Sequence, residues 1–342
     1  MFTPEKELVS LEIYQKASRI DPLELDDTFK LLPDINRVAD TDALLDALNH
    51  SIIQLSSKTL TTTSSLAALR DLDFLASSYV RHGRNPIEEV VGLEEAFIEL
   101  GNNIGTVPRG TVATYALANP TGERERNFTG DPEETLFIEA VRNTSLALER
   151  SLKDFIHTDA PTALKGFNNN LDVAISSIVS VMRELPPEYF TKEMRPYFEP
   201  LVIGGEKYLG AGGSQLQFVA FDYILWGATE TNEMYQKYLK ENYAYLTPSQ
   251  KESMTLIMEK YDSRPLLEHF AISNDKVAAE AAIGALRKMK KFRYPHRKLA
   301  QDNFKVRSPG QVGSGAYTTD ILDVLLERTE MAVEVAEGIL TS

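Results

Sequence analysis

Apolar residues recur at spacings of three and four along most of the chain, a periodicity typical of α-helices with one buried face. It predicts helices within residues 42–60, 67–83, 133–156, 276–292 and 319–340. Alternating apolar and polar positions, which would indicate half-buried strands, are few, so any sheet is expected to be marginal. The pattern therefore predicts an all-α protein.

Capping residues support several of these helices. Thr41 and Asp42 stand where the first of them begins, and Thr247-Pro248-Ser249 precedes a further helical stretch with proline near its first turn. Gly83 fits the position just after a helix C-terminus, because glycine adopts a positive φ without strain. These residues predict where individual helices begin and end.

The composition is that of an ordinary globular protein. The 342 residues, 43% hydrophobic and 25% charged, can form one large domain or two unequal lobes. The longest apolar stretches are too short to cross a bilayer, and the N-terminus lacks the features of a signal peptide. The chain has no cysteine, which excludes disulfides, thiolate metal sites and covalent heme attachment. We therefore expect a cytoplasmic protein.

The net charge of −14 argues against nucleic acid or a membrane surface as a partner, because both attract a basic surface. Positive charge is nevertheless concentrated between Arg287 and Arg307, where nine Lys or Arg residues occur with one acid, Asp302. Such a segment suits a small anionic ligand or cofactor, although a solvated helix face is the commoner explanation.

Three glycine-containing loops interrupt the predicted helices, at residues 119–132, 204–214 and 308–317. Glycine before a helix lets backbone N–H groups approach a ligand closely, although a plain connection explains such loops as well. None of the loops carries GxxxxGK[ST], and none places GxGxxG after a strand. The standard nucleotide-binding loops are therefore excluded.

Four of the five histidines have structural explanations. His50 and His82 fall at expected helix C-termini, where an imidazolium interacts favourably with the helix dipole. His157 precedes a turn, and His269 lies on a helix face. The chain also lacks HExxH, a Gly-x-Ser-x-Gly elbow and a cysteine nucleophile. A hydrolase and a metal site with several protein ligands are therefore poorly supported.

His296 differs from the other histidines in its surroundings. It follows Pro295 near the end of a long predicted helix, and proline can bend a helix and redirect the next side chain. Arg293 precedes it by three residues, on the same helical face. A noncovalent b-type heme needs one imidazole for an axial bond, and a guanidinium can pair with a propionate. A lone histidine is more often structural, so the pattern alone leaves both interpretations open.

Short segments spread over nearly the whole chain resemble those of a known family. In chain order they are Leu32–Arg37, Asp71–Phe74, Arg81–Gly83, Asn119–Thr121, Phe128–Gly130, Phe198–Pro200, Gly204–Gly205, Tyr208–Gly210, Leu225–Gly227, Phe292–Arg293, Pro295–His296, Lys298–Ala300, Gly313–Gly315 and Tyr317. Each segment alone is a weak signal, but their order and spacing are specific. The chain resembles the PrnB (monodechloroaminopyrrolnitrin synthase) family of heme enzymes, within the indoleamine/tryptophan 2,3-dioxygenase superfamily.

The resemblance implies an all-helical, indoleamine 2,3-dioxygenase-like fold that binds heme b noncovalently. It implies a heme-binding part in residues 151–342 and a smaller part in residues 1–150 that closes the pocket, unless the two form one continuous domain. His296 matches the axial ligand of the heme iron, and Arg293 matches an arginine beside a heme propionate.

The resemblance also implies contacts on the other face of the heme. A glycine-rich distal segment supplies candidates for contact with heme, O2 and substrate, namely Gly210, Gly212, Gly213 and Ser214. Ser314, flanked by Gly313 and Gly315, matches a serine near a propionate and the amino-acid end of the substrate. Phe304 departs from the family, because a tyrosine that approaches the substrate's polar end stands at this position. The departure implies a different substrate or a different way of holding it.

The function implied is a heme b-dependent oxygenase or oxidase in secondary metabolism. Its substrates would be O2 and tryptophan, a substituted tryptophan or a related indole or aromatic amine. One alternative is a non-catalytic heme-binding or gas-sensing protein on the same scaffold. Another is a relative that has lost heme and binds a different aromatic ligand. The sequence does not specify an oligomeric state, and a homodimer stays open.

Overall fold

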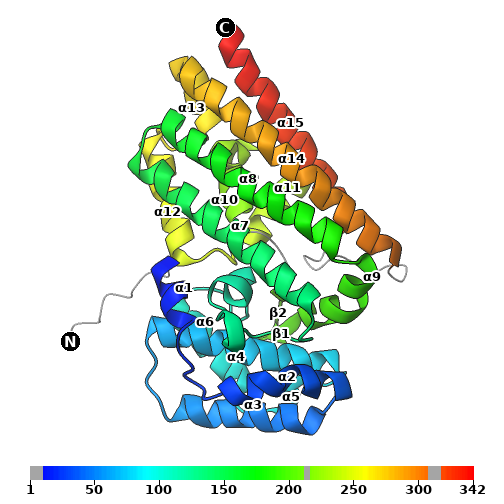
Figure 1. Ribbon diagram of the computed structural model, residues 1–342. Coiled ribbons are helices and arrows are strands. Elements are labelled where there is room, and N and C mark those ends of the chain that lie inside the picture. Colours follow the sequence, from blue (N-terminus) through cyan, green and yellow to red (C-terminus); the bar gives the residue numbers. More distant parts are fainter. Residues whose placement is uncertain (1–10, 212–215, 307–316) are drawn as a thin grey trace, which may run out of the picture. The chain divides into compact units, whose positions relative to one another are not determined.

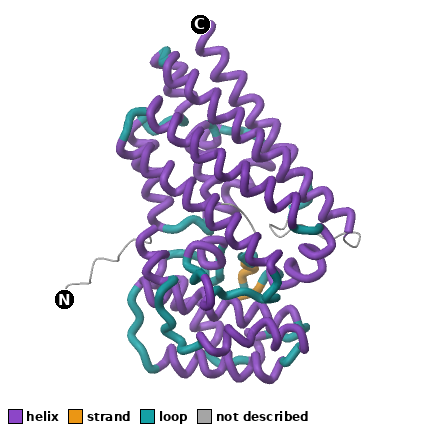
Figure 2. The backbone as a smooth tube through the Cα atoms, in the orientation of Figure 1, coloured by secondary structure: helices purple, strands orange, loops and turns teal. Residues whose placement is uncertain are grey.

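The computed structural model describes residues 11–211, 216–306 and 317–342 (Figure 1). Its regular structure is almost entirely helical. In the described residues the one sheet pairs β1 (Leu201–Ile203) with β2 (Glu206–Tyr208) in antiparallel register, Val202 opposite Lys207 (Figure 2). The all-α class predicted from the periodicity is confirmed. No helix in these ranges is both long enough and apolar enough to cross a membrane.

The structure divides into two compact units, and neither is one continuous stretch of chain. The N-terminal unit contains residues 11–139 and 188–211, and the C-terminal unit contains residues 140–187, 216–306 and 317–342. The division falls inside α7 (Pro132–His157), after residue 139, whereas the resemblance implied a division at residue 150. Helical periodicity is a local property, so it gives no sign that residues 188–211 rejoin the first unit.

The N-terminal unit is organised around α4 (Thr62–Arg81). All side chains from Ser65 to Tyr79 are buried, because α1, α3 and α6 pack around this helix. Thr61 and Ser64 form a capping box at its start, and Gly83 follows its end with a φ of 78°, as the sequence predicted. The other elements of the unit are α1 (Leu11–Ala17), α2 (Asp26–Val38), α3 (Thr41–Ser56), α5 (Pro86–Glu89), α6 (Leu93–Ile104), η1 (Ala113–Leu117), η2 (Gly122–Arg124), η3 (Phe190–Met194) and η4 (Arg195–Phe198).

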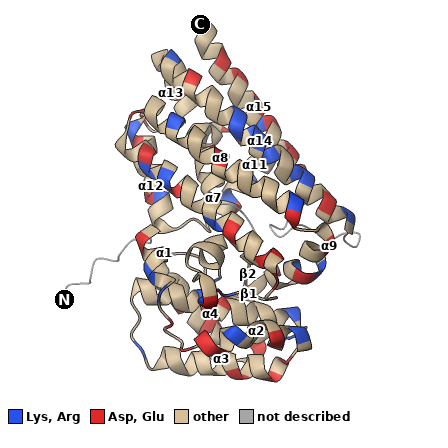
Figure 3. Ribbon diagram, viewed as in Figure 1, with Lys and Arg blue, Asp and Glu red and all other residues tan. Residues whose placement is uncertain are grey.

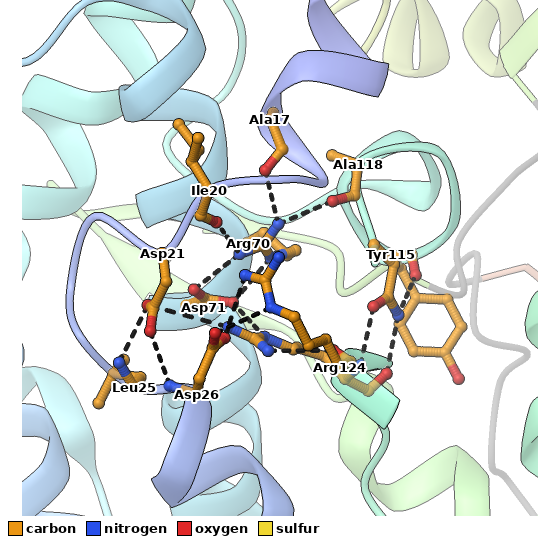
Figure 4. Close-up of polar contacts among 12 residues, drawn as sticks. Ala17, Ile20, Asp21, Leu25, Asp26, Arg70, Asp71, Tyr115, Ala118 and Arg124 are labelled. Atoms are coloured by element: carbon orange, nitrogen blue, oxygen red, sulfur yellow. Dashed lines mark hydrogen bonds and ion pairs between the residues drawn. The ribbon is translucent and has the colours of Figure 1, made fainter. Parts of the chain in front are cut away.

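Two fully buried arginines hold loops of this unit against α4 (Figure 4). Arg70 donates to both carboxylate oxygens of Asp71, at 2.7 and 2.8 Å, and to three backbone carbonyls. Arg126 donates to Asp71 at 3.1 Å and to Asp26 at 2.6 Å. Charges are tolerated in a protein interior when they are paired in this way. We call Arg70, Asp71, Arg126 and Asp26 the Arg70 cluster.

The first glycine-containing loop, residues 119–132, is closed by its own hydrogen bonds. The Asn119 side chain donates to the Arg126 carbonyl at 2.7 Å and accepts from its N–H at 2.8 Å. The buried Glu134 accepts from the N–H groups of Phe128 and Thr129 at 2.9 and 2.8 Å. These bonds tie the backbone at Arg126, Phe128 and Thr129 to the protein itself, which favours a structural connection.

The C-terminal unit is built on three long helices. α14 (Lys276–Val306) packs against α8 (Ala160–Glu184) and α15 (Asp320–Thr341), and their apolar faces share one core (Figure 1). α14 continues through Pro295, which leaves the carbonyl of Lys291 without an intrahelical donor. The remaining elements are α9 (Pro187–Tyr189), at the boundary of the units, and α10 (Leu216–Leu225), η5 (Gly227–Thr229), α11 (Glu233–Tyr243), α12 (Pro248–Lys260) and α13 (Leu266–Ser273).

The basic segment of α14 faces acidic side chains of α8 and α15 (Figure 3). The ion pairs between these helices join Arg287 to Glu337, Lys288 to Asp172, Lys290 to Glu330 and Arg297 to Asp323. Lys298 and Lys305 both contact Asp302. The pairing favours a helix face over an anion site. Arg307 lies outside the described residues.

Candidate active site

His296 lies half-buried in the second half of α14, with its ring against aromatic side chains. Its ring centroid is 5.8 Å from that of Phe292, one turn earlier on the same helix. Phe292 in turn stacks on Phe218 of α10, with centroids 4.4 Å apart and planes inclined by 21°. The imidazole therefore borders an apolar wall formed by α10 and α14.

The His296 ring forms no hydrogen bond or ion pair with any residue in the described part of the chain. Each of the other histidines either lies near an oxygen atom of the protein or is exposed to water. His50 and His82 lie 3.1 and 3.2 Å from oxygen atoms of Leu23 and Asn36, His269 lies 3.3 Å from a carboxylate oxygen, and His157 is exposed to water. The ring nitrogens of His296 therefore have no protein partner in these ranges and are available to a ligand.

Burial, together with the positive charge of Arg293, lowers the pKa of His296 to about 4. The imidazole is therefore neutral at pH 7, the form in which a ring nitrogen can bind a metal ion. Its aromatic neighbours offer the apolar contacts that a porphyrin face requires. The residues present around His296 thus fit the axial ligand of a heme.

Arg293 is fully engaged inside the C-terminal unit. Its guanidinium forms an ion pair with Asp222 of α10 and donates to the Thr329 hydroxyl and the Leu325 carbonyl of α15. Burial raises the pKa of Asp222, and the charge of Arg293 opposes that shift. A heme propionate would have to compete with Asp222 for this cation, so the propionate contact implied for Arg293 stays a prediction. We call Arg293, Asp222 and Thr329 the Arg293 cluster.

The structure adds a buried carboxyl group that the sequence did not single out. Glu149 of α7 accepts a hydrogen bond at 3.0 Å from the side-chain amide of Gln217 and another from that of Gln250. Burial raises the pKa of Glu149, which favours its protonated form. The Gln217 oxygen has no partner among the described residues. Glu149 is therefore a group that can hold a proton next to the first turn of α10.

The other predicted site residues lie on different elements or outside the described ranges. Gly210 belongs to the N-terminal unit, where a Cβ atom would lie 2.6 Å from the carbonyl oxygen of Phe198. Close backbone packing therefore accounts for this glycine without a cofactor. Phe304 is half-buried on α14, just over two turns after His296. The residues outside the described ranges are Gly212, Gly213, Ser214, Gly313, Ser314 and Gly315.

Little in the sequence indicated that Asp222 and Glu149 are buried side chains with partners. Asp222 is the acid within the apolar run of α10, and an acid in such a run usually has a buried cationic partner. Glu149 and Gln250 lie 101 positions apart, and nothing local to either residue indicates the contact. Tertiary packing alone brings these side chains together.

The comparison with known protein families supports the motifs found in the sequence. The model of the family described as monodechloroaminopyrrolnitrin synthase PrnB matches residues 42–337. The match takes in most of the chain, including His296, Arg293, Gly210 and Phe304, and it extends over both units. The protein belongs to the monodechloroaminopyrrolnitrin synthase (PrnB) family.

Proposed function

We propose that this protein is a heme b-dependent oxygenase or oxidase of secondary metabolism. Its substrates would be O2 and tryptophan, a substituted tryptophan or a related indole or aromatic amine. The observation that carries the proposal is the neutral imidazole of His296, which lacks a partner in the described part of the chain and borders the Phe218–Phe292 wall. Membership of a family named for an enzyme supports a catalytic role.

His296 would hold the iron, and the heme, when bound, would supply the oxygen and electron chemistry that side chains lack. A metal-bound histidine is usually oriented by a hydrogen bond from its second ring nitrogen. His296 has no such bond within the described ranges, so packing against Phe292 must orient the ring. The same wall covers one side of the imidazole.

The Arg293 cluster would fix the position of the helix that carries His296. Its contacts join α14 to Asp222 on α10 and to Thr329 on α15. Because three helices meet at one buried guanidinium, a shift of α14 would break several strong hydrogen bonds at once. The cluster therefore acts as a support for the ligand helix.

The side chain at position 304 affects how the polar end of the substrate could be held. Phenylalanine cannot donate a hydrogen bond, so the polar end of the substrate would have to be held by other groups. This supports a substrate, or a mode of holding it, that differs from that of relatives with tyrosine here. A Phe304→Tyr variant tests this directly, because the added hydroxyl should change the preference among substituted tryptophans.

The proposed function is tested by absorption spectroscopy of the reduced protein, titrated with tryptophan, 7-chlorotryptophan and tyrosine and then exposed to O2. We expect a heme spectrum that shifts with at least one indole, followed by its turnover. His296→Ala should lack this spectrum, and His269→Ala is its matched control, because His269 is also a partly exposed histidine of the C-terminal unit. A heme spectrum that no indole or aromatic amine perturbs, with no turnover, would contradict the proposal.

A further inference from the structure

Four aromatic side chains form a continuous series in the C-terminal unit: Trp226, Tyr235, Tyr238 and Tyr317. Trp226 follows α10 and packs against the same small apolar cluster as Tyr235 and Tyr238 of α11. The Tyr235 and Tyr238 ring centroids are 6.4 Å apart, and those of Tyr238 and Tyr317 are 5.7 Å apart. The three tyrosine rings thus follow one another closely, and Trp226 joins the series through the interaction of its indole with the Tyr235 hydroxyl.

The inner end of the series lies beside the Arg293 cluster. The Arg293 guanidinium is 5.7 Å from the centre of the Trp226 ring, and its charge also acts on His296, three positions along the same helix. The Trp226 Nε1 and the Tyr235 hydroxyl are buried, and the hydroxyl interacts with the Trp226 N–H and with the Asp222 carboxylate. Burying these two polar groups carries a desolvation cost that apolar packing alone does not explain.

Carboxylates stand beside the phenols at both ends of the tyrosine series. The Tyr317 hydroxyl donates a hydrogen bond to Glu241, whose side chain is 48% exposed. Burial raises the pKa of Tyr235, and the charge of the neighbouring Asp222 raises it further. A tyrosine gives up an electron readily only when its phenolic proton can leave as well. Glu241 can accept that proton at the outer end.

We propose that Trp226, Tyr235, Tyr238 and Tyr317 form an electron relay between the surface and the region beside His296. When a one-electron oxidant takes an electron from Trp226, electrons move inward ring by ring until Tyr317 is the oxidised residue. In this last transfer Tyr317 gives its electron to the relay and its phenolic proton to Glu241, which leaves a neutral tyrosyl radical. A small-molecule reductant of the thiol or ascorbate class returns one hydrogen atom equivalent to Tyr317, and the exposed Glu241 releases its proton to water.

In the working enzyme the oxidant would be an oxidised heme iron formed without substrate, and this use of the relay rests on the proposed function. The relay would then protect the site from self-oxidation. The transfer from Trp226 to Tyr317 itself depends only on the side chains described above. It can therefore be tested without heme.

Trp226 is the sole tryptophan of the chain, so a laser flash that ionises tryptophan creates the radical at one known position. In the wild-type protein we expect the tryptophanyl absorption to decay as a tyrosyl absorption grows. Tyr235→Phe should slow this decay at least about tenfold, the effect of a barrier raised by ~1.4 kcal/mol. Tyr235→Phe keeps the ring and removes only the hydroxyl, and thermal unfolding checks that the fold is retained.

Tyr243→Phe is the matched control, because Tyr243 lies on the same helix but is 42% exposed and outside the series. Tyr317→Phe should leave the first transfer intact and remove the long-lived surface radical. Equal decay rates in the wild type, Tyr235→Phe and Tyr243→Phe would overturn the relay. So would a tyrosyl radical that persists unchanged in Tyr317→Phe.

A second measurement uses the heme-loaded protein treated with peroxide in the absence of substrate. We expect a tyrosyl signal by electron paramagnetic resonance, and faster bleaching of the heme in Tyr317→Phe than in Tyr243→Phe. If the protein takes up no heme, the proposed function fails while the flash experiment still decides the relay. If heme binds but the two variants bleach at the same rate, the protective use is wrong.

Discussion

Each unit contains a buried cluster in which arginine pairs with aspartate, and the two clusters differ in what surrounds them. In the Arg70 cluster, the buried arginines donate to carboxylates and to backbone carbonyls, and no polar side-chain atom of the cluster lacks a partner in the described residues. Beside the Arg293 cluster lies His296, whose ring forms no hydrogen bond or ion pair within those residues.

The two clusters therefore differ in their neighbours. A buried cation whose partners are all within the protein needs no ligand to explain it. A neutral imidazole without a protein partner has ring nitrogens available to a ligand. We interpret the Arg70 cluster as a clamp on loops and propose the Arg293 cluster as the support of the His296 site.

The largest effect is expected from Asp71→Ala in the N-terminal unit. Asp71 is the partner of two buried arginines, so its loss should lower the free energy of unfolding by about 3–5 kcal/mol. Urea unfolding measures this. Asp34→Ala is the control, because Asp34 and Arg37 form an exposed pair that should contribute less than about 1 kcal/mol. Similar losses in both variants would contradict the clamp.

Asp222→Ala should have the next largest effect, about 3 kcal/mol, because one buried cation loses its carboxylate. Replacing both members, as Asp222→Leu with Arg293→Met, removes the buried charges together and should recover much of that stability. The double variant should nevertheless retain heme less well than the wild type, since the support of α14 is gone. Full heme retention in a stable double variant would show that the cluster serves the fold alone.

Gly210→Ala tests whether close packing explains a glycine that the family resemblance assigned to the cofactor. The added Cβ would lie 2.6 Å from the Phe198 carbonyl oxygen, and overpacking of this kind lowers stability by about 1–3 kcal/mol. We expect the loss in the apoprotein, measured by thermal unfolding. Gly338→Ala is the control, because a Cβ there meets no atom within 4 Å, so the change should stabilise α15 slightly. An effect of Gly210→Ala seen only with heme present would restore the cofactor role.

A smaller effect is expected from the pH dependence of Glu149. Burial raises its pKa in the folded protein, so between the unfolded and folded pKa values the folded state binds more protons. Stability should therefore fall as the pH rises above about 4.5, the usual pKa of glutamate. Glu149→Gln keeps an acceptor for both amides and should flatten this fall. The measurement is the free energy of unfolding of the apoprotein from pH 4.5 to pH 8. If it changes with pH in the same way in the wild type and in Glu149→Gln, a buried proton at Glu149 is excluded.

The sequence predicted the local features of the fold, and its assignment of His296 to the site stays a prediction. Helical periodicity located α4, α14 and α15, and Gly83 marked a helix end, because each of these signals lies within a few residues. The pairs Arg293–Asp222 and Glu149–Gln250 join residues 71 and 101 positions apart, and their contacts depend on packing that periodicity does not encode. The basic segment of α14 likewise showed its acidic partners only in three dimensions.

The central claim, that His296 is the axial ligand of a heme, is tested most directly by His296→Gly purified with added heme and then given free imidazole. The wild type and His269→Gly should show one tightly bound heme with a Soret band of a histidine-ligated iron. We predict that His296→Gly loses this spectrum and that imidazole, entering the space of the missing ring, restores it. An unchanged Soret band in His296→Gly without imidazole would contradict the account.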